Sequence, residues 1–240
     1  MLGKNFIFIE PPKNATTSIR AVLKSSEVPL YSKIGEIDRH APAWFVKNVL
    51  GPHIWNSLYT FTVVRHPVER IISEFKYSKK VAAPWDGSVQ GGENDPYRMA
   101  CIKLHSDCGN INDYIDLLQK QYCASLARIN KQPTQHFHNM HGKYAHPQGF
   151  PLVNCMIKTQ RSMICSPYGE VLVKKVCRLE NLTTDFKEVC DTLGLEFRLP
   201  KLNSTSPKKH ELSQSSIDII SAIYKDDFEI FGYNQGNPKP

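Results

Sequence analysis

The sequence has 240 residues, of which 41% are hydrophobic and 22% are charged, a composition typical of a soluble globular protein. This length favours a single domain that is large enough to bury a core. The net charge of +7 indicates an anionic ligand or partner. Basic residues are spread along the chain and no RNA- or DNA-binding motif is present, so we exclude nucleic acid as that partner.

The first predicted element is a short strand, Phe6–Ile9, built from aromatic and β-branched residues. Pro11 and Pro12 end it, because proline cannot donate a hydrogen bond to a neighbouring strand. Apolar residues at helical spacing then predict a helix over 15–27. The loop between this strand and this helix contains Lys13, Asn14, Ala15, Thr16, Thr17 and Ser18.

This loop is a candidate anion site. The first turn of a helix has N–H groups without partners in the helix, and the helix dipole adds partial positive charge there. The hydroxyls of Thr16, Thr17 and Ser18 add donors, and Lys13 adds a full charge. The alternative is an ordinary loop in which a threonine or serine caps the helix and Lys13 is solvated. The Walker A pattern G-x-x-x-x-G-K-S/T is absent, which disfavours a nucleoside triphosphatase.

A candidate proton acceptor lies before the next predicted helix. We expect a loop over 35–40 and a helix over 42–50, closed by Gly51 and Pro52. The neutral imidazole of His40, at the end of this loop, is suited to take the proton of a hydroxyl group. Alternatively, His40 caps the helix.

The segment from Trp55 to Val64 is predicted to return the chain to the sheet, with a strand over 58–64. Two strands joined by a long helical crossover pair in parallel, with a right-handed connection. Ligands of such sheets bind at the carboxyl ends of the strands, and both Lys13 and Arg65 follow a predicted strand end.

Arg65 opens a second candidate phosphate site. Pro67 suits the first position of a helix, and Ser73 lies within that helix. A guanidinium can bind a phosphate through two parallel hydrogen bonds, which a lysine cannot do. The alternative is a surface ion pair of Arg65 with Glu69 or Glu74, and an ordinary helical serine at 73.

The remaining elements are predicted from hydrophobic spacing and turn residues. They are a long turn-rich loop at 81–108, a helix at 111–121, a strand at 171–177, and helices at 184–193 and 213–227. Histidines gather between 136 and 146, but neither an H-E-x-x-H motif nor Cys/His pairing accompanies them. We therefore predict no metal site.

Two motifs carry a family resemblance. Residues 12–18 resemble the 5′-phosphosulfate loop of the sulfotransferases, P-K-T/N-G/A-S/T-S/T-S/T. Residues 65–75 are similar to their 3′-phosphate motif, R-D/N/H-P-x-x-R-x-x-S-x-F/Y. The likeness is closest to the carbohydrate-type branch, because the C-terminal G-x-x-G-x-x-K loop of the cytosolic steroid and phenol branch is absent. It extends from Phe6 to Tyr233.

The resemblance implies an enzyme that moves a sulfonate group from 3′-phosphoadenosine 5′-phosphosulfate (PAPS) to a hydroxyl acceptor, most simply a carbohydrate. It also implies a P-loop-like three-layer α/β fold with a central parallel sheet flanked by helices. We expect one domain over 1–240, with a loop-rich acceptor-side insertion at about 81–165. The alternatives are a small-molecule sulfotransferase, a nucleotide-dependent kinase, and a non-catalytic anion- or glycan-binding module.

The resemblance also implies roles for individual residues. His40 would be the general base, and Lys13 would stabilise charge on the departing phosphate. Gln135 and His136 would lie on the acceptor side, with the 81–108 loop as a lid, and Glu180 would be structural. The expected donor-binding residues are Lys13, Asn14, Ala15, Thr16, Thr17, Ser18, Arg65, Ser73, Ser204 (or Ser206) and Lys208.

Cysteine usage and the N-terminal sequence bear on location. Seven cysteines without a C-x-x-C pair favour free thiols in a reducing compartment, although disulfides within 101–165 are an alternative. The longest N-terminal apolar run has four residues, so we expect neither a signal peptide nor a membrane span. The sequence therefore indicates either a soluble cytoplasmic enzyme or a catalytic fragment.

Overall fold

The computed structural model describes residues 1–25, 40–87, 92–131, 158–198 and 211–235. Contacts divide the chain into two compact units. The first unit comprises Met1–His66 and Thr159–Ser204, and the second comprises Pro67–Lys158 and Thr205–Pro240.

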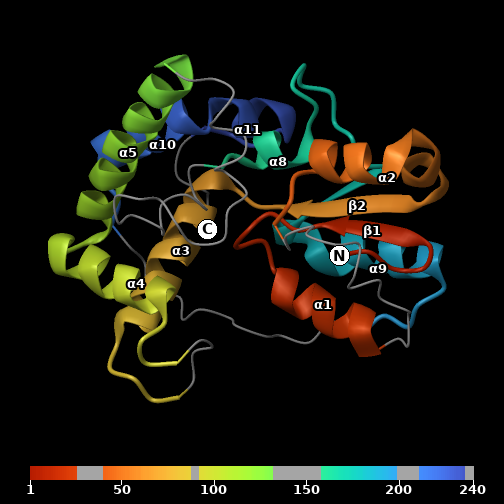
Figure 1. Ribbon diagram of the computed structural model, residues 1–240, viewed down its shortest axis with the longest axis horizontal. Helices are drawn as coiled ribbons and strands as arrows, with labels where there is room; N and C mark the ends of the chain where they lie inside the picture. The colour runs from red at the N-terminus through yellow and green to blue at the C-terminus, as the bar shows by residue number, and fades with distance from the viewer. Residues whose placement is uncertain (26–39, 88–91, 132–157, 199–210, 236–240) are drawn as a thin grey trace. The chain divides into compact units, whose positions relative to one another are not determined.

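The first unit is built on a parallel sheet of three strands in the order β1-β2-β3. These strands are β1 (Phe6–Ile9), β2 (Tyr59–Val64) and β3 (Lys175–Arg178). Helices flank the sheet, so the predicted α/β class is confirmed (Figure 1). The prediction of a single domain stays a prediction.

Aromatic side chains fill one face of this sheet. Phe8 stacks on Phe61 with ring centroids 4.8 Å apart, and the ring of Phe186 packs against Phe61 in a tilted arrangement at 6.2 Å. Helices α1 (Thr16–Ser25) and α9 (Leu182–Leu193) bury their apolar residues in this cluster. Side chains alternate along a strand, so Ile7 and Ile9 face the opposite side, where α2 lies (Figure 1).

Helix α2 (Ala43–Ser57) is longer than predicted, because it continues past Gly51. Gly51 has a φ of 77°, which interrupts the helix, and Pro52 then begins a second helical segment. Trp55 is buried in this second segment, so the chain turns back to the sheet only after Ser57, and the strand predicted over 58–64 is observed as β2. The Nζ of Lys174 donates to the carbonyls of Asn56 and Leu58, 2.9 and 2.8 Å away, where α2 ends.

Three shorter features complete the first unit. Helix α8 (Gln160–Ile164) starts behind Thr159, whose Oγ1 accepts from the N–H of Ser162. The 3₁₀ helix η1 (Leu179–Asn181) joins β3 to α9. The third strand lies later than the predicted 171–177, because Val171 forms only a single antiparallel bridge with Cys165.

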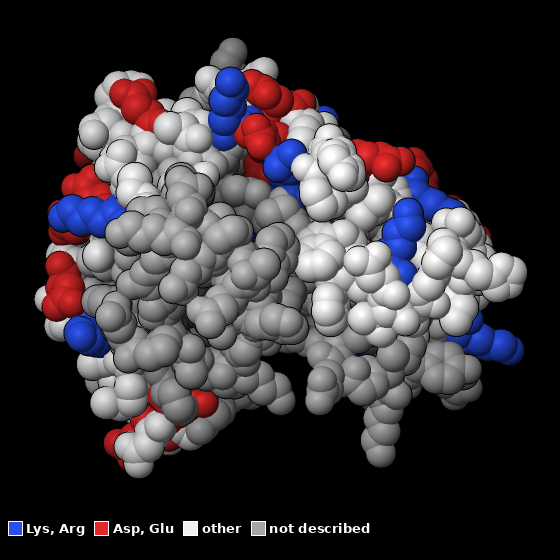
Figure 2. Space-filling view, turned by 45° about the horizontal axis from the view of Figure 1, so that its top comes forward, with Lys and Arg blue, Asp and Glu red and all other residues white. Residues whose placement is uncertain are grey.

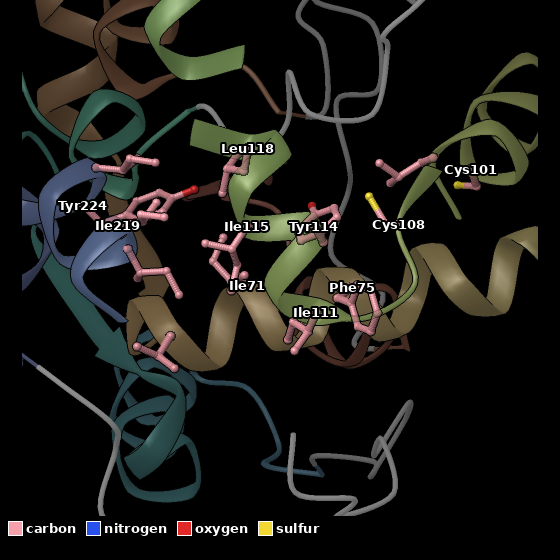
Figure 3. Close-up of a cluster of buried hydrophobic side chains, with 14 of the residues drawn as sticks. Ile71, Phe75, Cys101, Cys108, Ile111, Tyr114, Ile115, Leu118, Ile219 and Tyr224 are labelled. Atoms are coloured by element: carbon pink, nitrogen blue, oxygen red, sulfur yellow. The ribbon is translucent and has the colours of Figure 1, made fainter. Parts of the chain in front are cut away.

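The second unit is helical. The helices among its described residues are α3 (Pro67–Ala82), α4 (Pro96–Asp107), α5 (Ile111–Lys131), α10 (Gln214–Ile223) and α11 (Lys225–Ile230). Figure 3 shows their shared core, in which Phe75, Tyr114 and Ile115 lie between side chains of the neighbouring helices. Helix α5 extends beyond the predicted 111–121, and the predicted helix at 213–227 is divided into α10 and α11.

Helix α4 corrects the prediction of one long loop at 81–108. Asp95 caps this helix by accepting from the N–H groups of Tyr97 and Arg98, at 2.8 and 3.2 Å. Pro96 follows at the first helical position, where its missing N–H costs nothing. An acidic cap followed by proline is a signal for the start of a helix, and the sequence contains it at Asp95 and Pro96. The glycines and the proline just before it favoured the interpretation as a loop.

Candidate active site

The loop between β1 and α1 has an unusual backbone. Lys13 and Ala15 have φ values of 70° and 55°, in the left-handed region that glycine normally occupies. Each such residue costs on the order of 1–3 kcal/mol, so neighbouring contacts must hold the loop in place. Strain of this kind is concentrated at ligand sites and active sites.

The loop ends at the N-terminus of α1. The carbonyl of Ala15 accepts from the N–H of Ile19 at 3.2 Å, which makes Ala15 the residue before the first turn. The N–H groups of this turn have no carbonyl of their own helix to bind. No acidic residue lies in the turn. The predicted donors therefore sit at a helix end that favours an anion, with Thr16 and Ser18 buried and Thr17 exposed.

The side chain of Asn14 is bound within the protein. It is fully buried, and its Nδ2 donates to the carbonyl of Val63 at 2.8 Å and to Oε1 of Gln160 at 2.7 Å. Both amide hydrogens are thereby used. Its Oδ1 is also buried and has no hydrogen-bond partner within the described residues.

Arg65 is brought to the same loop. Its N–H donates to Oε1 of Gln160 at 2.8 Å, and its carbonyl accepts from Nε2 of Gln160 at 2.9 Å. Its guanidinium donates to the carbonyl of Lys13 over a long 3.5 Å. The predicted strand-end residues Lys13 and Arg65 are thus neighbours.

The ends of β2 and β3 are also joined by a side chain. Oε1 of Glu180 accepts from the N–H of His66 at 2.8 Å, and Oδ2 of Asp185 accepts from the N–H of Arg178 at 2.7 Å. The Glu180 contact links the residue that follows β2 to η1, and its structural role stays a prediction.

His40 lies against the end of β1. Its Nδ1 is 2.7 Å from the carbonyl oxygen of Glu10. A carbonyl can only accept, so Nδ1 carries the hydrogen, and Nε2 is the unprotonated nitrogen of the neutral ring. The carboxylate of Glu10 is buried and pairs with Arg20 of α1 at 2.8 Å. Pro42, which cannot donate a side-chain hydrogen bond, occupies the N-cap position of α2, and the alternative role of His40 as a cap stays open.

The structure does not test the roles of several predicted site residues. Gln135, His136, Ser204, Ser206 and Lys208 lie outside the described residues, so their roles stay predictions. Ser73 lies in α3 of the second unit, and its role also stays a prediction. The other basic residue of the 65–75 motif, Arg70, is 1% exposed and donates from both terminal nitrogens to the carbonyl of Lys158, which gives it a structural contact.

Gln160 is the site residue that the sequence did not reveal. It is fully buried at the start of α8 and joins Asn14 to Arg65. No motif or spacing marks it, because it meets its partners only through the tertiary fold.

The buried cysteine of β3 is not a candidate nucleophile. Cys177 lies in β3, and burial raises the pKa of its thiol to about 12. The thiol therefore stays protonated at neutral pH. Each of the six cysteines in the described segments is free, and Cys155 lies outside them.

Basic side chains do not form one continuous patch in the view of Figure 2. Among the residues coloured in Figure 2, lysine and arginine side chains lie at separate places and are interspersed with acidic ones.

Within the described residues, none of the helices combines the length and the apolar character that a membrane crossing requires.

The fold and the site define an α/β protein whose loop after β1, at the carboxyl end of a parallel strand, leads into the N-terminus of a helix. The model of the sulfotransferase family matches residues 4–234, and the chain belongs to this family. The match is to the carbohydrate sulfotransferase-like branch, whose members are PAPS-dependent transferases, so the predicted family and enzyme class are confirmed. A comparison with curated proteins found no match.

Proposed function

We propose that this protein transfers a sulfonate group from PAPS to a carbohydrate hydroxyl, with His40 as the general base. The observation that carries this proposal is the 2.7 Å contact between Nδ1 of His40 and the carbonyl of Glu10. This contact orients the ring, and it leaves Nε2 as the nitrogen that can take a proton. A base with a fixed tautomer beside an anion-binding loop is what hydroxyl activation requires.

The residues present fit the two phosphates of the donor. The left-handed backbone at Lys13 and Ala15 leads directly into the first turn of α1, whose N–H groups suit a 5′-phosphate. Arg65 suits the 3′-phosphate, because a guanidinium can bind two phosphate oxygens at once. When bound, PAPS supplies an electrophilic sulfur and a phosphate leaving group. Ser73, Ser204 and Lys208 are proposed as further donor contacts.

His40 and Lys13 have different roles in the proposed transfer. His40 accepts the acceptor's hydroxyl proton at Nε2 while the acceptor oxygen bonds to sulfur. The bond between sulfur and the 5′-phosphate oxygen breaks, and Lys13 with the N–H groups of α1 stabilises the charge left on that phosphate. General base catalysis of this kind contributes typically ~10²–10⁴ in rate. We expect no metal requirement, so turnover should persist in a chelator.

A saccharide acceptor is supported by the branch of the family and by the net charge of +7, which suits an acidic glycan. Gln135 and His136 are proposed to contact it. A small-molecule alcohol is the alternative, and transfer of labelled sulfonate to a panel of saccharides and small alcohols distinguishes the two. The six free cysteines agree with a reducing cytoplasmic location, which we also propose.

The test of the proposed chemistry is turnover of His40→Ala and Lys13→Ala. We expect both variants to lose activity, His40→Ala by roughly 10²–10⁴-fold in kcat, with its affinity for 3′,5′-adenosine bisphosphate retained. His53→Ala on α2 and Lys24→Ala on α1 are matched controls, because both residues are exposed. Wild-type rates in both site variants would end the proposal. A wild-type protein that binds the bisphosphate but transfers nothing would indicate the non-catalytic module.

A further inference from the structure

The two strand-end loops are joined by a buried chain of hydrogen bonds, here called the amide bridge: the side chains of Asn14 and Gln160 and the backbone of Arg65. Oε1 of Gln160 accepts from Nδ2 of Asn14 and from the N–H of Arg65, at 2.7 and 2.8 Å. Nε2 of Gln160 donates to the carbonyl of Arg65 at 2.9 Å. A second hydrogen of Asn14 reaches the carbonyl of Val63 at 2.8 Å.

The polarity of the amide bridge follows from the backbone alone. The N–H of Arg65 can only donate and its carbonyl can only accept, so Gln160 must present its oxygen to the first and its nitrogen to the second. The group of Asn14 that faces Oε1 must then be its amide nitrogen, which is also what the carbonyl of Val63 requires. Only one orientation of both side chains satisfies every contact, so the bridge holds one geometry.

We propose that Gln160 is a positioning residue that fixes the spacing between the two phosphate-binding loops through the amide bridge. Gln160 contacts Asn14, between the two left-handed residues of the first loop, and both backbone groups of Arg65. Asn14 and Gln160 are both fully buried. A bond lost here cannot be replaced by bulk water, and the strained loop loses a contact that holds it.

The consequence concerns ligands that reach both loops, and it rests on the proposed function. A nucleotide with a 5′- and a 3′-phosphate gains from loops held in advance at the right spacing, because no ordering is needed on binding. A nucleotide with one phosphate engages one loop, and the spacing matters little to it. Disturbing the amide bridge should therefore weaken bisphosphate binding selectively.

The test is the dissociation constant of three ligands: 3′,5′-adenosine bisphosphate, 5′-AMP and 3′-AMP. Gln160→Glu keeps the size of the side chain and its acceptor oxygen but replaces the donor that faces the carbonyl of Arg65. We expect roughly tenfold or greater loss for the bisphosphate and less than about threefold loss for either monophosphate. Asn14→Ala breaks the bridge from its other end and should give the same pattern, so the test does not depend on the folding of one variant.

Thr62→Val is the matched control. Oγ1 of Thr62 is fully buried and donates to the carbonyl of Ile9 at 3.0 Å, which joins β1 to β2 without involving the phosphate loops. This variant should lower Tm while all three affinities stay within about threefold of wild type. A merely structural role of Gln160 would reproduce this control.

The outcomes separate the two proposals. A selective loss for the bisphosphate in Gln160→Glu and Asn14→Ala supports the positioning role. Equal loss for all three ligands, or no loss, overturns it while leaving the proposed function intact. If the unmodified protein does not prefer the bisphosphate over both monophosphates, the proposed function itself fails, and the positioning role fails with it.

Discussion

The two units of the chain differ in what their buried side chains do. In the first unit, buried polar side chains gather where the parallel strands end, and Asn14, Gln160 and Glu10 each bond to backbone or to a charged partner. The second unit packs helices around an apolar core (Figure 3). It also buries charge, but Arg70 there donates to a backbone carbonyl within the same unit.

The two units also differ in backbone strain. Within the described residues, the only residues other than glycine with positive φ are Lys13 and Ala15, both in the first unit. A strained loop persists only where its surroundings determine it, and the amide bridge is such a surrounding. In the first unit, the strained backbone at Lys13 and Ala15 lowers stability at the candidate site. In the second unit, the helices gain stability from ordinary apolar burial.

The largest expected effect on stability is in the core of the second unit. Leu118 is fully buried among apolar side chains, so Leu118→Ala should cost about 2–5 kcal/mol through lost burial and the cavity left behind. Met99→Ala removes a residue that is 51% exposed and should change stability by less than about 0.5 kcal/mol. Urea unfolding followed by circular dichroism measures both. Equal effects would contradict the assignment of this core.

A smaller effect is expected when alanine is replaced by glycine at one position in each unit. Ala15→Gly relieves a left-handed residue and should stabilise the protein by about 1 kcal/mol, after allowing for the greater freedom of glycine in the unfolded chain. Ala100→Gly lies within the helix α4 and should destabilise by about 1 kcal/mol. Midpoints of chemical unfolding give both values. The same sign for the two variants would show that the loop is not strained.

The smallest effect is a pH dependence in the second unit. Burial, together with nearby Lys79, lowers the pKa of His105 below its usual 6.5, and its Nε2 lies 2.9 Å from Oγ of Ser78. The unfolded chain then binds this proton at a higher pH than the folded protein. The stability that the neutral ring contributes is present above pH 6.5 and is lost as the pH falls toward the folded-state value.

His105→Gln tests this directly. Unfolding free energies of wild type and variant should fall together with pH from carboxylate protonation, but wild type should lose more as the pH falls below 6.5. Gln can still hydrogen bond to Ser78, so the difference reports the proton rather than a lost contact. Parallel curves for the two proteins would show that His105 does not titrate abnormally.

Much of the site was predictable because its signals are local. A short β-branched strand followed by prolines predicted β1, and Pro67 predicted the start of α3. The strand-end positions of Lys13 and Arg65 then followed from the rule for parallel sheets. These features depend on neighbouring residues, which the sequence states directly.

The rest depends on distant residues. Lys13 and Ala15 carry no glycine signal, so their left-handed backbone could not be read from the sequence. Gln160 follows Arg65 by 95 residues and becomes meaningful only when α8 packs beside the sheet. The helix α4 was missed for a different reason, because its cap at Asp95 was present but was read as part of a turn-rich loop.

The central proposal is that the loops at Lys13 and Arg65 bind the two phosphates of one nucleotide, and the thermal stability of the unmodified protein tests it most directly. We would measure Tm with 3′,5′-adenosine bisphosphate, with ADP and with AMP. A ligand at ~100 times its Kd stabilises by roughly 2.7 kcal/mol, so a clear rise in Tm with the bisphosphate alone is the predicted result. A rise with ADP but not with the bisphosphate, or no rise with any ligand, would contradict the two-phosphate site.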